Sequence, residues 1–153
     1  MSAIVRANGG FLRAASLTAA AVEDEAKAVI HTQARLGNEV ATVQALYYIA
    51  TGVAPFVSRR TFEAVTGPKT DWWLVQTVGA LVSILGGALL HSAVARKVTT
   101  KDRLIAISVA AGLGAIESAN AIRRRISRVY LLDALLQACF ISAWALTKSD
   151  GHS

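Results

Sequence analysis

The chain has 153 residues, of which 54% are apolar and 17% are charged, with a net charge of +6. This length corresponds to one domain, and the charged fraction lies below the roughly 25% that is usual in soluble proteins. The charges are clustered and leave long uncharged stretches, a pattern typical of an integral membrane protein. The basic residues flank these stretches instead of lining one helix face, which excludes a nucleic-acid partner and favours anionic lipid head groups.

Residues 1–40 are predicted to form an N-terminal amphipathic arm. Residues 1–22 contain two arginines and no acid. One interpretation is a helix lying on the membrane surface, with its apolar side chains turned inward; these are Phe11, Leu12, Leu17 and Val22. The alternative is an organelle targeting segment, because such segments are also rich in Arg, Ser and Ala.

The helical pattern of the arm continues to Gly37, which favours the surface helix over the targeting segment. Asn38 follows directly and has the side chain of a good N-cap. The sequence therefore predicts that one helix ends near Gly37 and that the next begins after Asn38.

Residues 41–148 are predicted to form a four-helix transmembrane domain, followed by a polar tail at 149–153. The expected helices lie near 42–58, 73–95, 104–122 and 129–147. The last three are mainly apolar segments of about 19 or more residues each, long enough to cross a ~30 Å hydrocarbon core. The first contains Gly52 and Pro55 and is shorter, so a re-entrant or interfacial segment is the alternative for it.

The connections between these helices are short and charged. Residues 58–73 contain a Gly67-Pro68 turn, and Thr70 or Asp71 is placed to cap the following helix. The run RRRISR at 123–128 carries four arginines and is expected to turn at a membrane surface. Short links predict an up-down-up-down bundle. Equal numbers of Lys and Arg flank its two sides, so the positive-inside rule does not orient it.

Small residues recur every fourth position on two of the predicted helices. Gly79, Ser83 and Gly87 form one such ridge, and a ridge of this kind lets another helix approach closely. The third helix repeats the pattern, and its small residues are Ala111, Ala115 and Ala119.

The segments FEAVTGPKTDWWLVQTVG (62–79) and ISRVYLLDALLQ (126–137) resemble parts of small bacterial four-helix membrane proteins. These proteins are grouped loosely as DoxX-like, and many have no assigned function. The similarity covers about residues 42–147 and leaves out the N-terminal arm. It implies a compact four-helix membrane fold and transfers no catalytic residue, because the group has no single chemistry.

Two acids fall at matching depth on the last two helices. Glu117 lies six residues before Arg123, about 9 Å below the turn, and Asp133 lies five residues after Arg128, about 7.5 Å below it. Ionisable groups in spanning helices usually face the bundle interior. We therefore expect a polar cluster at this end of the bundle, formed by Gln76, Glu117, Asn120 and Asp133.

This cluster has two interpretations. In the structural one, the acids pair with arginines of their own turn and with Asn120 or Gln76, which fixes helix register. In the functional one, Glu117 and Asp133 share a proton and are candidate catalytic residues or part of a ligand site. A cavity that reaches both acids would favour the second interpretation, and a dry contact paired with arginine would favour the first.

The sequence thus predicts a small membrane module that binds a partner subunit, a lipid or an apolar ligand. The alternative is an enzyme or a proton-coupled carrier acting on a lipophilic substrate, with Glu117 and Asp133 as the acid/base pair. Candidate partners are membrane lipids, a partner membrane subunit or a second copy of the chain, and an apolar ligand.

No cofactor is expected, and no metal site is expected, because no His, Cys and carboxylate ligands share one predicted depth. His91 falls toward the opposite end of its helix from the acids and is expected to form hydrogen bonds within the bundle or to lie at the interface. A second polar spot that it forms with Gln44 and Tyr47 is the alternative. The bacterial inner membrane is the expected location, and the composition of residues 1–22 leaves an organelle membrane as the alternative.

Overall fold

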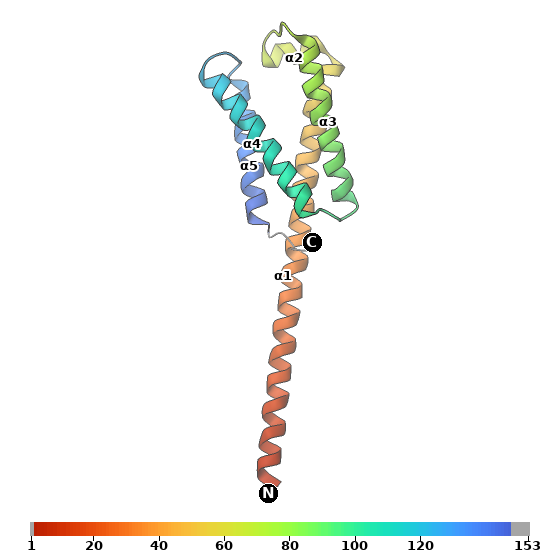
Figure 1. Cartoon of the computed structure of the whole chain (residues 1–153), viewed down its shortest axis with the longest axis vertical. Coiled ribbons are helices and arrows are strands. Elements are labelled where there is room, and N and C mark those ends of the chain that lie inside the picture. Colours follow the sequence, from red (N-terminus) through yellow and green to blue (C-terminus); the bar gives the residue numbers. More distant parts are fainter. Residues whose placement is uncertain (1, 148–153) are drawn as a thin grey trace. The chain divides into compact units, whose positions relative to one another are not determined.

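The computed structural model describes the backbone of residues 2–147 and the side chains of residues 18–147. Within this part the chain is all-helical and contains no strand (Figure 1). Its helices are α1 (Ser2–Val57), α2 (Arg59–Thr66), α3 (Trp72–Val94), α4 (Thr100–Ile122) and α5 (Val129–Leu146). The expected inward side chains of Phe11, Leu12 and Leu17, and the polar tail at 149–153, lie outside what the structure describes.

The chain divides into two units between Gln33 and Ala34. In the first unit, residues 18–32 all have exposed side chains, and Val22, expected to be turned inward, is 66% exposed. Helix i,i+4 pairing is present here, since Lys27 Nζ lies 2.7 Å from Glu23 Oε1.

Helix α1 does not break where the sequence predicted a break. Gly37 and Asn38 both lie inside one continuous helix, and Thr42 Oγ1 donates to the Asn38 carbonyl at 2.7 Å. Good helix formers flank both residues, and a single interior glycine costs a helix only about 1 kcal/mol. A capping residue therefore does not begin a new helix here.

Four helical segments are long and apolar enough to cross a membrane, which supports an integral membrane protein in contact with lipid. They are Thr18–Val57, Trp72–Val94, Thr100–Ile122 and Val129–Leu146. Large apolar side chains on them are exposed, among them Ile84 at 67% and Leu132 at 64%. Such surfaces suit lipid better than water.

Within the second unit, the end of α1 packs against α3 through small residues. A methyl group on Gly79 would lie 2.6 Å from the carbonyl oxygen of Gly52, and one on Gly86 would lie 2.8 Å from that of Ala45. The two helices therefore approach backbone to backbone and run in opposite directions. The predicted ridge is wrong at Gly87, which has nothing within 4 Å of its Cβ position; its neighbour Gly86 makes the contact.

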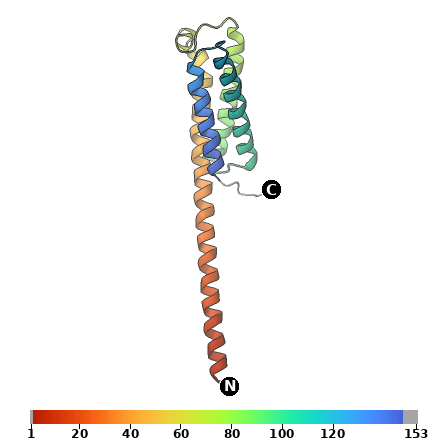
Figure 2. The same ribbon diagram turned by 90° about the vertical axis from the view of Figure 1, so that its left-hand side faces the viewer.

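The other helices of this unit complete the packing around α1. In Figures 1 and 2, α5 lies beside α1, and α4 lies beside α5 and α3. A buried cluster of mostly small side chains joins α1, α3, α4 and α5; its members are Ala41, Ala45, Leu89, Ala93, Ala106 and Trp144. Small side chains allow the close helix approach that membrane packing requires.

Helix α4 begins four residues before the predicted start and buries a different face. Thr99 and Asp102 form a capping box, in which the Thr99 hydroxyl accepts from the Asp102 N–H and the Asp102 carboxylate accepts from the Thr99 N–H. The predicted small-residue ridge at Ala111, Ala115 and Ala119 is exposed. The buried residues of α4 are Ala106, Ala110, Glu117 and Ala121.

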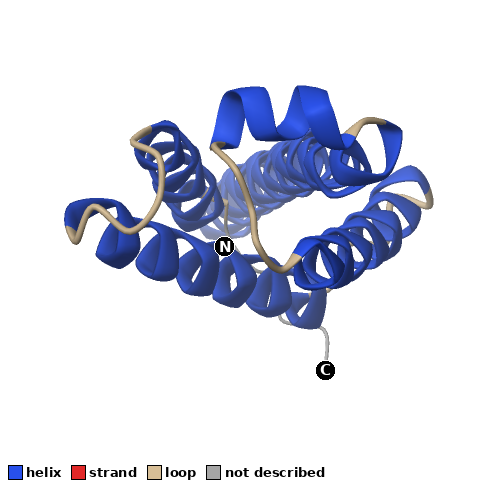
Figure 3. Cartoon of the chain, turned by 90° about the horizontal axis from the view of Figure 1, so that it is seen from above, coloured by secondary structure: helices blue, strands red, loops and turns tan. Residues whose placement is uncertain are grey.

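Helix α2 interrupts what the sequence suggested was a loop between the first two spans. Ser58 caps it by accepting a hydrogen bond from Thr61 N at 3.2 Å. Figure 3 shows α2 lying across the end of the bundle at which α1 finishes and α3 starts. Asp71 holds the N-cap position of α3 as expected, but its side chain makes no capping hydrogen bond.

Candidate functional site

A cavity of about 860 Å³ lies within the second unit, beneath α2 and between α1, α3, α4 and α5. This volume is in the range of pockets that enclose a drug-sized ligand. The walls are mainly apolar; they include Pro55, Phe62, Val65, Leu74, Val78, Val82, Leu113, Leu132 and Leu136. A site of this kind accommodates a lipophilic molecule.

The apolar walls continue to the outer surface of the helices. Leu74 and Val78 of α3 line the cavity and are 48% and 45% exposed. On α5, Leu132 and Leu136 also line it and are exposed. The cavity lining therefore shares apolar residues with the exposed surface of α3 and α5.

Polar side chains gather at one end of this apolar space. Asp133 is held by two donors, because Tyr47 donates its hydroxyl hydrogen to Oδ1 and Gln137 Nε2 donates to the same atom at 3.2 Å. Glu117 of α4 and Asp133 of α5 both belong to the cavity lining. Two carboxyl groups from neighbouring helices are therefore presented to the same apolar space.

Glu117 itself is incompletely satisfied. Its side chain comes from the buried face of α4, the residue is only 9% exposed, and Oε2 has no hydrogen-bond partner. Buried polar atoms nearly always have partners, so an orphan atom that faces a cavity indicates room for a ligand group. Neither Glu117 nor Asp133 forms an ion pair with arginine in the described part of the chain. The arginine-paired structural interpretation is not what the structure shows.

A network of buried hydrogen bonds between α1 and α5 extends to Asp133. The Trp144 indole donates to Gln44 Oε1 at 2.7 Å, and Gln44 Nε2 donates to Tyr48 Oη at 2.9 Å. The Tyr48 hydroxyl in turn donates to Gln137 Oε1 at 3.1 Å. Because Gln137 also binds Asp133, this network fixes the side chain of Asp133 through α1 and α5.

Sequence reasoning missed Gln137, although a pattern was available. It follows Asp133 by four residues and precedes Trp144 by seven, so all three lie on one face of α5. Gln137 is 1% exposed. When a polar residue follows an acid at helical spacing on an otherwise apolar helix, the two residues mark the face that points into the bundle.

Two of the four predicted cluster residues do not reach the cavity. Gln76 is partly buried on α3 but is absent from the cavity lining. Asn120 donates to the carbonyl of Ile116 on its own helix at 2.8 Å. His91 is exposed on α3, and the second polar spot predicted around it does not form, because Gln44 and Tyr47 bind residues of α5 instead.

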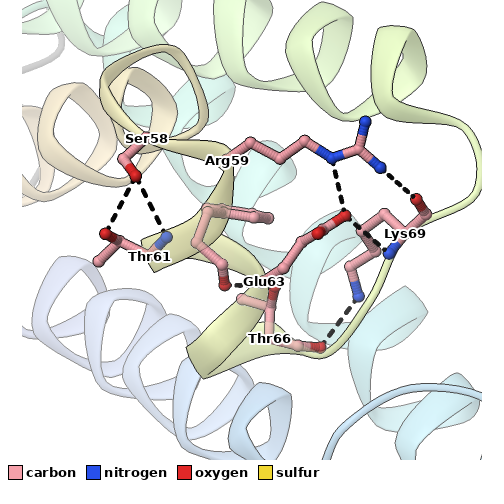
Figure 4. Close-up of polar contacts among 7 residues, drawn as sticks. Ser58, Arg59, Thr61, Glu63, Thr66 and Lys69 are labelled. Carbon is pink, nitrogen blue, oxygen red and sulfur yellow. Dashed lines mark hydrogen bonds and ion pairs between the residues drawn. The ribbon is translucent and has the colours of Figure 1, made fainter.

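Helix α2 is fastened over the cavity by contacts on its polar side, shown in Figure 4. Glu63 Oε1 accepts from Arg59 Nε and from the Lys69 backbone N–H, each at 3.1 Å. The Arg59 guanidinium lies 4.9 Å above the Trp72 ring, and the Lys69 ammonium lies 5.1 Å from the centre of the Tyr130 ring. These contacts tie α2 to α3 and α5.

Lys69 is a basic residue whose ammonium lies over the ring of Tyr130, a residue of the cavity lining. Its ammonium donates to the Thr66 carbonyl at 3.0 Å. Partial burial lowers the pKa of Lys69, and the Glu63 carboxylate opposes that effect. Lys69 does not line the cavity.

Among the described residues, no group of three His, Cys, Asp or Glu side chains is arranged to hold a metal ion. Comparisons with protein-family models, with curated proteins and with solved structures found no match to this chain.

Proposed function

We propose that this chain is a small integral membrane protein that binds a lipophilic molecule in the cavity beneath α2. The observation that carries the proposal is an apolar cavity of about 860 Å³ with a polar cluster at one end. A ligand with an apolar body and one polar group matches both parts. The body would contact the walls, and the polar group would meet Tyr47, Glu117 and Asp133.

The membrane arrangement is part of the same proposal. The four spanning segments form an up-down bundle, with the 123–128 turn and α2 on one side of the membrane. The resemblance to DoxX-like four-helix proteins agrees with this order of helices. The bacterial inner membrane is the proposed location, with an organelle membrane as the alternative.

A second candidate function is catalysis or proton-coupled transport that uses Glu117 and Asp133 as an acid/base pair. The orphan Oε2 of Glu117 favours it, because a carboxyl oxygen open to a cavity is free to exchange a proton with a substrate. Proton flux across liposomes in the presence of a substrate distinguishes this candidate from binding alone.

The test of the binding proposal is to fill the cavity. Val78→Trp places a large ring in the wall, and Ile84→Trp places the same ring on the exposed face of the same helix. Binding of tritiated triphenylphosphine oxide, a neutral lipophile, is measured by equilibrium dialysis of the purified protein in detergent, with empty micelles as the blank.

We expect Val78→Trp to weaken binding about tenfold or more, because the ring occupies the ligand's volume. Ile84→Trp is expected to bind like the wild type. Equal binding by both variants, or no binding by the wild type, would contradict the proposal.

A further inference from the structure

The charged residues that line the cavity indicate which charge a ligand should carry. Asp133 and Glu117 are the charged residues among its lining residues, and no Lys, Arg or His belongs to the described lining. A carboxylate in this mainly apolar lining therefore has no basic partner within the cavity. An uncompensated buried charge is costly, so a ligand of opposite charge is favoured.

The lining also contains the groups that stabilise a diffuse cation. Aromatic rings face the cavity from three helices; they are Tyr47, Tyr48, Phe62 and Tyr130. Ring faces attract bulky organic cations, and the attraction grows when the cation is desolvated. The same groups disfavour an anionic head group, because the acids repel it and no basic side chain in the lining neutralises it.

From these observations we infer that the cavity binds a lipophilic organic cation, such as a protonated amine or a quaternary onium ion, with its charge against Glu117 and Asp133. This inference rests on the binding function proposed above and adds the charge of the ligand. The unpartnered Oε2 of Glu117 is the contact that the ligand completes.

Basic side chains outside the lining oppose this preference for a cation, and Lys69 is one of them. Its ammonium is held on the Thr66 carbonyl and over the Tyr130 ring, on the side of α2. The acids lie in the cavity itself, where the dielectric constant is low and their field is screened less than that of the partly exposed lysine. We therefore expect the lining, which holds two acids and no basic residue, to favour a cation over an anion.

The test compares three probes of similar shape: tetraphenylphosphonium, tetraphenylborate and neutral triphenylphosphine oxide. Each is dialysed against the full chain in detergent, with empty micelles as the blank. We expect the phosphonium ion to bind about tenfold or more tightly than the neutral probe, and the borate ion not to bind above the blank.

The double variant Glu117→Gln/Asp133→Asn removes both carboxyl groups from the lining and nearly preserves its shape. It is expected to weaken phosphonium binding about tenfold or more while neutral binding is retained, which also shows that the variant is folded. Asp71→Asn removes an acid at the same end of α3, outside the cavity lining, and is expected to leave phosphonium binding unchanged.

The outcomes separate the two proposals. If the neutral probe binds and the phosphonium ion binds no more tightly, the ligand charge is wrong and the binding function stands. Phosphonium binding that survives in the double variant also overturns the inference, because the carboxyl groups then do not recognise the charge of the ligand. If none of the probes binds above the blank, the binding function fails together with the inference.

Discussion

At the scale of single residues, glycine decides how closely α1 and α3 approach. A methyl group on Gly79 or Gly86 would fall under 3.0 Å from a backbone oxygen of α1, and a backbone oxygen cannot rotate away. Gly87, one residue further, has open space. The same change at neighbouring positions therefore has opposite consequences.

We predict that Gly79→Ala and Gly86→Ala each lower the free energy of unfolding in detergent by about 1–3 kcal/mol, because the helices must move apart. The melting temperature is expected to fall with it. Gly87→Ala is the matched control. It is expected to melt at or above the wild-type temperature, since alanine favours the helix by about 1 kcal/mol over glycine. Melting curves followed by circular dichroism measure this; three equal midpoints would show that the contact is absent.

Gln44 is the second residue on which stability depends. It is fully buried and links the Trp144 indole, the Tyr48 hydroxyl and the Ala106 carbonyl, which belongs to α4. Gln44→Leu has a similar size and removes these hydrogen bonds. The indole N–H then loses its acceptor.

We expect Gln44→Leu to lower the free energy of unfolding by about 1–3 kcal/mol, the usual cost of an unsatisfied buried polar group. Gln76→Leu is the control, because Gln76 is less buried and makes no hydrogen bond among those described. Thermal melting in detergent compares the two. A larger loss for Gln76→Leu than for Gln44→Leu would mean that the α1 network is not formed.

At the scale of elements, α2 is a short helix that depends on its contacts. It has no buried residue of its own, and helices this short are marginal without tertiary support. Glu63 supplies that support by binding Arg59 within α2 and the Lys69 backbone beyond it. The exposed ion pair contributes little alone, so the bond to Lys69 N is the important one.

We predict that Glu63→Gln speeds hydrogen exchange of the α2 amides several-fold, because the amide is a weaker acceptor than the carboxylate. Arg60→Gln is the control on the same helix, as Arg60 is exposed and has no ion pair among the described residues. Exchange followed by mass spectrometry on the peptide covering 58–71 gives the answer. Equal exchange rates in both variants would show that Glu63 does not hold α2.

At the scale of the whole molecule, the exposed apolar surface of the spanning helices requires a bilayer. We expect the protein to stay in the membrane pellet after alkaline carbonate treatment, which strips proteins held by charge alone. Release into the supernatant would contradict integral insertion. Immunoblotting of both fractions measures the outcome.

The single cysteine allows the order of the helices to be tested. With Cys139→Ser as background, Lys97→Cys and Ser127→Cys place one thiol in each of two successive connections. If the bundle is up-down, a membrane-impermeant maleimide labels one of these variants in sealed vesicles and the other in inverted vesicles. Labelling of both from the same side would rule out the up-down order.

The sequence by itself determined that the chain has four spanning segments, and it determined both ends of α3 and α5. Observed α3 and α5 lie within one residue of the predicted limits, because span length follows from bilayer thickness and from charged flanks, both of which are local properties. It also predicted that Glu117 and Asp133 lie at one level on adjacent helices, which follows from the rise per residue and a short turn. The capping box at Thr99 was equally readable but was overlooked, and α4 starts early for that reason.

Only the tertiary structure decided which face of each helix is interior. In a soluble helix, polar residues mark the outside, whereas a spanning helix is apolar on its lipid face and its packed face alike. Hydrophobic periodicity therefore does not indicate that Gly86, and not Gly87, makes the close contact. Nor does it indicate that Asp133 is bonded by Gln137 and not by Gln76 or Asn120. Both contacts depend on the rotation of each helix about its axis, which is set by backbone contacts and by the buried hydrogen bonds that join residues distant in sequence.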